Sequence, residues 1–300
     1  MPKFLKILLY PLMFFVAFAV FVVLLFPYDS VKTRVARELE GVMGGSYQIS
    51  IGTLSPSFPS GAFLKNVEMK PRSVGAGNPI TLSTANLKVA VLPLLSGTVE
   101  VDFDLHPPQG RASGSYSLKK GGLFLNLKAD RFDLGLVSFL IKDTGIPLSG
   151  MVSGDVDLEL YDQDPLRNSG KINLQVLQLA LGEISLGDGA FKIPAMKLAD
   201  SGGSRVDAAI NRGNFEVKVF TLTGGDLAID TNGKIYGARK ADNYRFNLKG
   251  TFKVTPEFAD KIQILALVDK QKQADGSYPF TITGRVLKPN IRIGDFKLPL

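Results

Sequence analysis

Residues 155–160 read Asp155-Val156-Asp157-Leu158-Glu159-Leu160, and residues 171–176 read Lys171-Ile172-Asn173-Leu174-Gln175-Val176. Polar and apolar side chains alternate throughout both segments. Because successive side chains of a β-strand point to opposite faces of a sheet, each segment has one apolar face and one polar face. The two segments therefore predict strands whose apolar face is covered by other structure or lines a cavity.

The same period of two recurs along most of the chain after residue 46. Further examples are residues 48–51, 87–91, 99–105 and 215–219. Turn sequences rich in Gly, Pro and Asn separate these segments, and short turns join neighbouring strands antiparallel. We predict a mainly β protein, with roughly twelve to fifteen strands in a long curved antiparallel sheet and a few short helices. Alternation alone does not distinguish an open trough from a closed sandwich, because both architectures need one apolar face.

Three segments have helical periodicity instead. Residues 31–42 place apolar side chains three and four residues apart, which predicts a short amphipathic helix. Residues 132–142 are apolar on nearly every side after the capping candidate Asp133, so a helix there has to be buried. Residues 255–270 begin with Thr255-Pro256-Glu257. A cap residue, a Pro at the first helical position and an acid beside the positive end of the helix dipole are typical of a helix start.

Residues 7–26 form an uncharged apolar stretch near the N-terminus, and twenty helical residues span a hydrocarbon core of about 30 Å. We predict a transmembrane helix over residues 7–27. Lys3 and Lys6 precede this stretch and Asp29 follows it, so the positive-inside rule places the N-terminus in the cytoplasm. The predicted membrane-span residues include Ile7, Leu12, Phe15, Val20, Leu24 and Phe26.

A cleaved signal peptide is the alternative interpretation of this stretch, because Ala17-Phe18-Ala19 has the small-x-small form of a cleavage site. Cleavage there would leave an apolar segment, residues 20–26, at the new N-terminus, so we favour the uncleaved span. The predicted organisation is a cytoplasmic tip (1–6), a transmembrane helix (7–27), an amphipathic connecting helix (28–45) and a β-rich domain (46–300).

Composition limits the chemistry that the chain can perform. It contains no Cys and one His, which excludes disulfides, thiolate catalysis and Cys-rich zinc sites. Asp155, Asp157 and Glu159 form the densest row of carboxylates, but alternation directs all three to the solvated face. No nucleophile elbow, phosphate-binding loop or dinucleotide fingerprint is present. We therefore expect a non-enzymatic protein with no catalytic residues, no cofactor and no metal site.

The net charge of +7 does not indicate a nucleic-acid partner, because the basic residues form no run and no basic helix. The apolar strand faces are more distinctive. The predicted lining of an apolar groove comprises Val156, Leu158, Leu160, Ile172, Leu174 and Val176. The same residues would suit the core of a sandwich, since pockets and cores use the same residue types.

Several short motifs carry a family resemblance. The apolar stretch ends at Phe26-Pro27, and residues 55–61 (Ser-Pro-Ser-Phe-Pro-Ser-Gly) lead into residues 64–69 (Leu-Lys-Asn-Val-Glu-Met). Later motifs in order are residues 91–97, 147–150, 224–226 and 278–284, followed by Lys288-Pro289. In this order over nearly the whole chain, the motifs resemble the periplasmic AsmA-like proteins, in particular the GspN family of type II secretion accessory proteins.

The resemblance implies a single-span inner-membrane protein of a double-membraned bacterium, with a cytoplasmic N-terminus and its bulk in the periplasm. It implies the inner membrane and other type II secretion subunits as partners, bound through protein–protein contacts. Larger AsmA-like proteins imply the alternative function, a lipid-binding or lipid-transfer module whose β-groove takes phospholipid. The motifs of the family mark turns and packing positions, so no catalytic residue is carried over to this chain.

Overall fold

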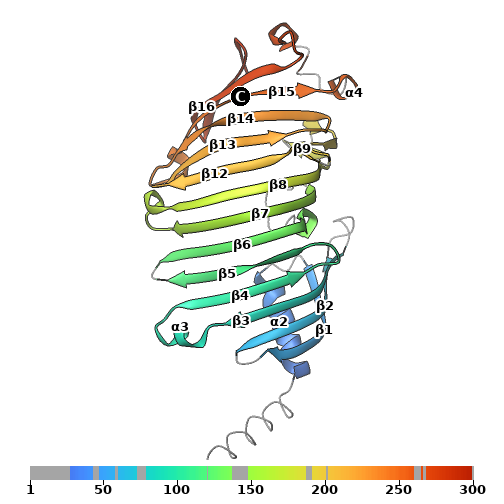
Figure 1. The fold of residues 1–300 in the computed structure, drawn as a ribbon, viewed down its shortest axis with the longest axis vertical. Coiled ribbons are helices and arrows are strands. Elements are labelled where there is room, and N and C mark those ends of the chain that lie inside the picture. The colour runs from blue at the N-terminus through green and yellow to red at the C-terminus, as the bar shows by residue number, and fades with distance from the viewer. Residues whose placement is uncertain are drawn as a thin grey trace, which may run out of the picture. The chain divides into compact units, whose positions relative to one another are not determined.

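The computed structural model describes residues 28–42, 47–57, 60–72, 79–119, 121–136, 148–186, 191–200, 202–259, 265 and 268–298. Within them the protein is mainly β, with sixteen strands in one open antiparallel sheet and a separate two-stranded hairpin (Figure 1). The chain divides between Leu87 and Lys88 into two compact units, unit 1 and unit 2. The predicted transmembrane segment, 7–27, lies outside the described residues, and no described helix is long and apolar enough to cross a membrane.

Unit 1 contains α2 (Tyr28–Val42), β1 (Tyr47–Ser57), β2 (Gly61–Pro71) and most of β3 (Ile80–Val89). Alternate residues of β1 are buried, and α2 packs against this strand. Glu40 of α2 accepts a hydrogen bond from the backbone N–H of Ile49 at 2.7 Å and pairs with Arg72 at 2.8 Å. The amphipathic helix predicted after the apolar stretch is thus confirmed, with its polar edge held by one carboxylate.

Unit 2 contains the remaining strands. Its long strands are β4 (Val99–His106), β5 (Arg111–Lys119), β6 (Gly122–Asp133), β7 (Leu148–Tyr161), β8 (Ser169–Leu181), β12 (Arg205–Asn211), β13 (Asn214–Leu222), β14 (Leu227–Tyr236), β15 (Arg245–Val254), β16 (Tyr278–Arg285) and β17 (Lys288–Ile293). The order β4-β5-β6-β7-β8-β12-β13-β14-β15-β16-β17 follows the chain, with each strand antiparallel to the next. Among these described strands, the chain order is interrupted only between β8 and β12.

The structure has more strands than the twelve to fifteen that we predicted, because it also contains four short ones. They are β9 (Ile184–Leu186), β10 (Phe191–Ile193), β11 (Met196–Lys197) and β18 (Phe296–Lys297). β9 and β10 form the separate hairpin, whereas β11 pairs with the end of β8 and β18 pairs with β17. Two or three residues cannot show an alternating pattern, so sequence periodicity does not find such strands.

The helix predicted over 132–142 is wrong at its start. β6 continues through Phe132 and Asp133, because these residues pair with Val152 and Met151 of β7. A 3₁₀ turn (Leu134–Leu136) follows, in which the Asp133 carboxylate accepts a hydrogen bond from the backbone N–H of Gly135 at 2.8 Å. Asp133 therefore caps this short turn, and residues 137–142 of the predicted helix lie outside the described residues.

The helix predicted from Thr255 is confirmed at its start. α4 (Pro256–Ala259) begins with Pro256, and the Thr255 carbonyl accepts hydrogen bonds from the N–H groups of Phe258 and Ala259. Most of the predicted continuation lies outside the described residues. A short α-helix, α3 (Val91–Leu95), was not predicted and lies directly before β4.

Asp275 gives the fold a testable pH dependence. Its pKa is lowered, first by the Ser277 hydroxyl, which donates a hydrogen bond at 2.6 Å, then by the Ser277 backbone N–H and by Lys253 at 3.0 Å. A lowered native pKa stabilises the fold above the unfolded-state value and loses that contribution as the pH falls through the native value. We expect urea unfolding midpoints to fall further between pH 5 and pH 2 for the wild type than for Asp275→Asn. Equal pH profiles would contradict this.

Candidate functional site

The strand register in unit 2 brings the six predicted lining residues onto one face. Val156 lies directly opposite Ile172, Leu174 lies opposite Gly154, and Val176 lies opposite Val152. Leu158 and Leu160 follow Val156 on the same face of β7, where they pair with Leu125 and Leu123 of β6. The pairing therefore places all six side chains on the same side of the sheet.

This apolar face extends far beyond β7 and β8. One cross-strand row passes from neighbour to neighbour over eleven strands, and it consists of Phe103, Gly114, Leu127, Val156, Ile172, Ala208, Val217, Gly233, Leu248, Ile282 and Ile291. At about 4.8 Å between strands, the row is about 48 Å long. We call the face that this row marks the apolar face.

On β7 and β8 the apolar face is buried at one end of the strands and partly exposed at the other. Val176 is only 6% exposed, because it belongs to a cluster with Leu179, Ala199 and Leu222. Val156, Leu158, Leu160, Ile172 and Leu174 are all partly exposed. Among the described residues the only other sheet is the β9–β10 hairpin, which has three residues in each strand, so no second sheet closes a sandwich over this face.

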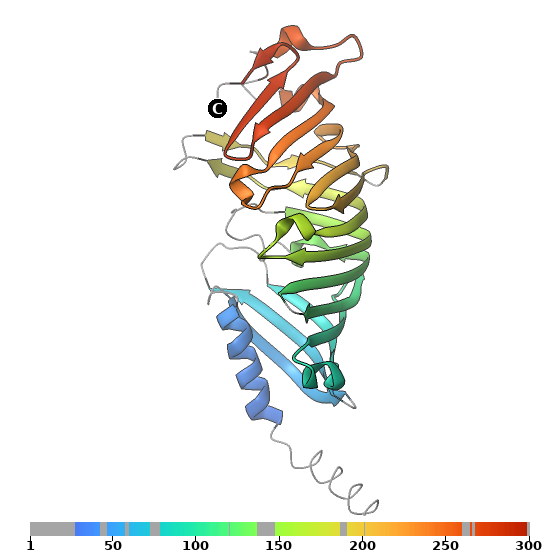
Figure 2. The ribbon, with the colours of Figure 1, turned by 90° about the vertical axis from the view of Figure 1, so that its left-hand side faces the viewer.

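Glycines on the apolar face allow the strands to bend. Gly154 and Gly233 have φ angles of 138° and 140°, which L-residues rarely adopt. A Cβ at Gly154 would lie 2.0 Å from the Asn173 carbonyl oxygen, and one at Gly233 would lie 2.2 Å from that of Asn247. Glycine kinks of this kind introduce curvature into a sheet. Figure 2 shows the strands of unit 2 curved along their length, as the predicted curved sheet requires.

The polar face of β7 holds the carboxylate row. Asp155 and Asp157 are exposed, as predicted, but Glu159 is partly buried. Glu159 accepts hydrogen bonds from the Tyr161 hydroxyl and from the Ser169 hydroxyl, the latter at 3.1 Å. The hydrogen bond to Glu159 is the main cause of the raised pKa of Tyr161. In the part of the chain that the structure describes, no three His, Asp or Glu side chains cluster in a way that could hold a metal ion.

Periodicity did not identify a second feature, the distribution of exposed apolar side chains. The large apolar residues exposed in the described parts are Val91, Leu92, Leu94, Val99, Leu118, Leu166, Tyr236, Val286 and Leu287. All of them lie in α3 or at the connections β5–β6, β7–β8, β14–β15 and β16–β17, or at the start of β4 beside α3. Because the strands are antiparallel, these connections all lie at the same ends of the strands, along one side of the sheet. We call this side, formed by strand ends and connections, the open edge. A run of apolar residues in a turn, such as 91–95, was the available signal.

No protein-family model, curated protein or solved structure matches this chain. The apolar face and the open edge are the features of the described structure that bear on function.

Proposed function

We propose that the chain is a non-enzymatic lipid-binding module whose apolar face holds acyl chains. The observation that carries this proposal is the partial exposure of five neighbouring lining positions on β7 and β8, on a face about 48 Å long. A packed sandwich core would bury these side chains almost completely. A ligand with apolar chains would complete their burial.

The dimensions suit an acyl chain. A bilayer core of about 30 Å holds two leaflets, so one acyl chain spans about 15 Å, well within the length of the face. Each methylene transferred from water to an apolar surface contributes about 0.8 kcal/mol. The pairs that β6 and β7 form at the centre of this face are apolar: Leu125 lies opposite Leu158, and Leu127 lies opposite Val156. The face is thus suited to chains and not to the recognition of a polar solute.

In this proposal residues 7–27 anchor the module in the bacterial inner membrane, and residues 46–300 occupy the periplasm. The anchor keeps the apolar face close to a source of phospholipid. The module handles lipid without catalysis, because alternation and pairing direct the carboxylates of β7 away from the apolar face.

The second candidate is a component of the type II secretion system that acts through protein–protein contacts. The motif resemblance and the exposed apolar side chains of the open edge favour it, since exposed apolar patches often mark interaction sites. The two candidates differ in what contacts Leu158: lipid in the first, and only the protein's own chain in the second.

Lipid content tests the first candidate. The full-length protein would be purified from bacterial membranes in mild detergent, extensively exchanged, and extracted for mass spectrometry. A bound lipid resists exchange, so we expect a reproducible molar ratio of phospholipid to protein above that of an unrelated single-span membrane protein handled in parallel. A ratio no higher than that of the reference protein would contradict the proposal.

A further inference from the structure

The corner formed by the ends of β14, β15, β16 and β17 carries an unusual row of charges. The register places Arg245 opposite Arg285, and Arg285 opposite Lys288. Like charges directly opposite each other on neighbouring strands are unfavourable. Within the described residues neither arginine side chain has a hydrogen bond or an ion pair, whereas on the neighbouring strands Lys234 pairs with Glu216 at 3.2 Å. The guanidinium N–H groups of Arg245 and Arg285 are therefore available to bind an anion.

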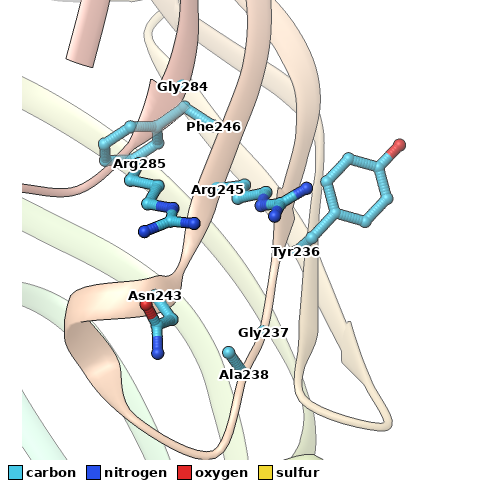
Figure 3. A pocket seen from close by; sticks show the side chains of 8 residues that line it. All are labelled: Tyr236, Gly237, Ala238, Asn243, Arg245, Phe246, Gly284 and Arg285. Atoms are coloured by element: carbon cyan, nitrogen blue, oxygen red, sulfur yellow. The ribbon is translucent and has the colours of Figure 1, made fainter. Parts of the chain in front are cut away.

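A hollow of about 990 Å³ lies at this corner, and Figure 3 shows its walls. Its lining residues are Tyr236, Gly237, Ala238, Asn243, Arg245, Phe246, Gly284 and Arg285. In Figure 3 the Arg285 guanidinium lies between Phe246 and Asn243, and the Arg245 guanidinium lies beside Tyr236. Two guanidinium groups and one amide are the groups that proteins use to bind phosphate oxygens.

The hollow lies at the ends of these strands and is lined from both faces of the sheet, because Arg245 and Arg285 alternate with Phe246 and Gly284 and so start from the face opposite to the apolar face. Ile235, Phe246 and Gly284 form a cross-strand row on the apolar face, and Phe246 and Gly284 also line the hollow. An amphiphile could therefore place its charged end at the arginines and pass its chains over the strand ends, past Phe246, onto the apolar face. The neighbouring β16–β17 turn exposes Leu287 (73% exposed) and Val286, which adds apolar surface at the rim.

We propose that this corner binds the phosphate group of an anionic phospholipid whose acyl chains lie on the apolar face. The inference rests on the proposed lipid-binding function and adds to it the headgroup class and the residues that select it. Arg245 and Arg285 bind the phosphate oxygens, and the bound anion relieves their mutual repulsion. The turn between β14 and β15 adds Arg239 and Lys240 against a single acid, Asp242, so the surroundings favour a lipid with net negative charge.

Calorimetric titration of the full-length protein in non-ionic detergent tests this site. The probes are short-chain phosphatidylglycerol, short-chain phosphatidylcholine and inorganic phosphate. The test variant is the double substitution Arg245→Gln and Arg285→Gln. The matched control is Arg205→Gln with Arg292→Gln, which removes two exposed arginines of the same sheet from positions outside the hollow.

We expect the wild type to bind phosphatidylglycerol at least tenfold more tightly than either of the other probes. The test variant should lose this preference, and the control should keep it within twofold. Unchanged phosphatidylglycerol binding by the test variant would overturn the proposal, and so would inorganic phosphate binding as tightly as the lipid. If the lipid-binding function itself fails, the purified wild type carries no phospholipid. If only the headgroup site fails, the wild type carries phospholipid and loss of the arginines changes nothing.

Discussion

The substitution Leu174→Glu is expected to remove most of the phospholipid that copurifies with the protein, at least tenfold relative to the wild type. Leu174 is partly exposed on the apolar face and lies between Gly154 of β7 and Val206 of β12. A carboxylate at this position would have to be desolvated beneath an acyl chain without a partner, which costs several kcal/mol. Because the site is partly exposed in the free protein, the charge can remain hydrated there and the fold should persist.

The adjacent substitution Gln175→Glu provides the matched control. It introduces the same charge one residue away, on the opposite face of the same strand, where Gln175 is exposed and lies opposite Arg205. The control should retain the wild-type lipid content, measured by mass spectrometry of the purified full-length protein. Circular dichroism should show the same strand content for both variants. Equal lipid content in the two variants, with both folded, would contradict an acyl-binding apolar face.

The second large effect is expected at Gly154, where Gly154→Ala should destabilise unit 2 by about 3 kcal/mol. Its φ angle of 138° strains any L-residue, and the new Cβ would lie 2.0 Å from the Asn173 carbonyl oxygen of the neighbouring strand. Either the β7–β8 pairing opens or the backbone shifts, and both reduce stability. Urea unfolding of the full-length protein in detergent, followed by circular dichroism, measures the change.

Gly202→Ala is the matched control for this prediction. Gly202 also lies in unit 2, but nothing lies within 4 Å of the position that its Cβ would take. The same added methyl group should leave the free energy of unfolding unchanged or raise it by a few tenths of a kcal/mol, because alanine restricts the unfolded chain. If Gly154→Ala and Gly202→Ala had the same stability, the bend at Gly154 would not depend on glycine.

The alternating segments predicted the strands and the face that each side chain occupies, because period two follows directly from backbone geometry. Val156 and Ile172 illustrate this, since their pairing needed only the short connection between β7 and β8. The end of β6 was not predictable in the same way. Phe132 and Asp133 begin a segment whose apolar pattern predicts a helix, but their pairing with β7 keeps them in the strand. Tertiary pairing overrides local preference at such boundaries.

The corner at Arg245 and Arg285 could not be predicted from the sequence. Both arginines look like ordinary solvated positions of alternating strands, and they are forty residues apart in the chain. Only the register of β15 and β16 places them side by side. The register depends on the length of the connection and on packing at both ends of the strands, which no local pattern encodes.

Photo-crosslinking in living cells distinguishes lipid from protein as the partner that covers the apolar face. A photoreactive residue would replace Leu158 in the full-length protein, with Asp157, exposed on the opposite face, as the comparison. We predict phospholipid adducts from position 158 and none from position 157. If position 158 instead crosslinks only within its own chain, while position 157 gives adducts with secretion-system proteins, the apolar face is a closed core and the lipid-binding function is contradicted.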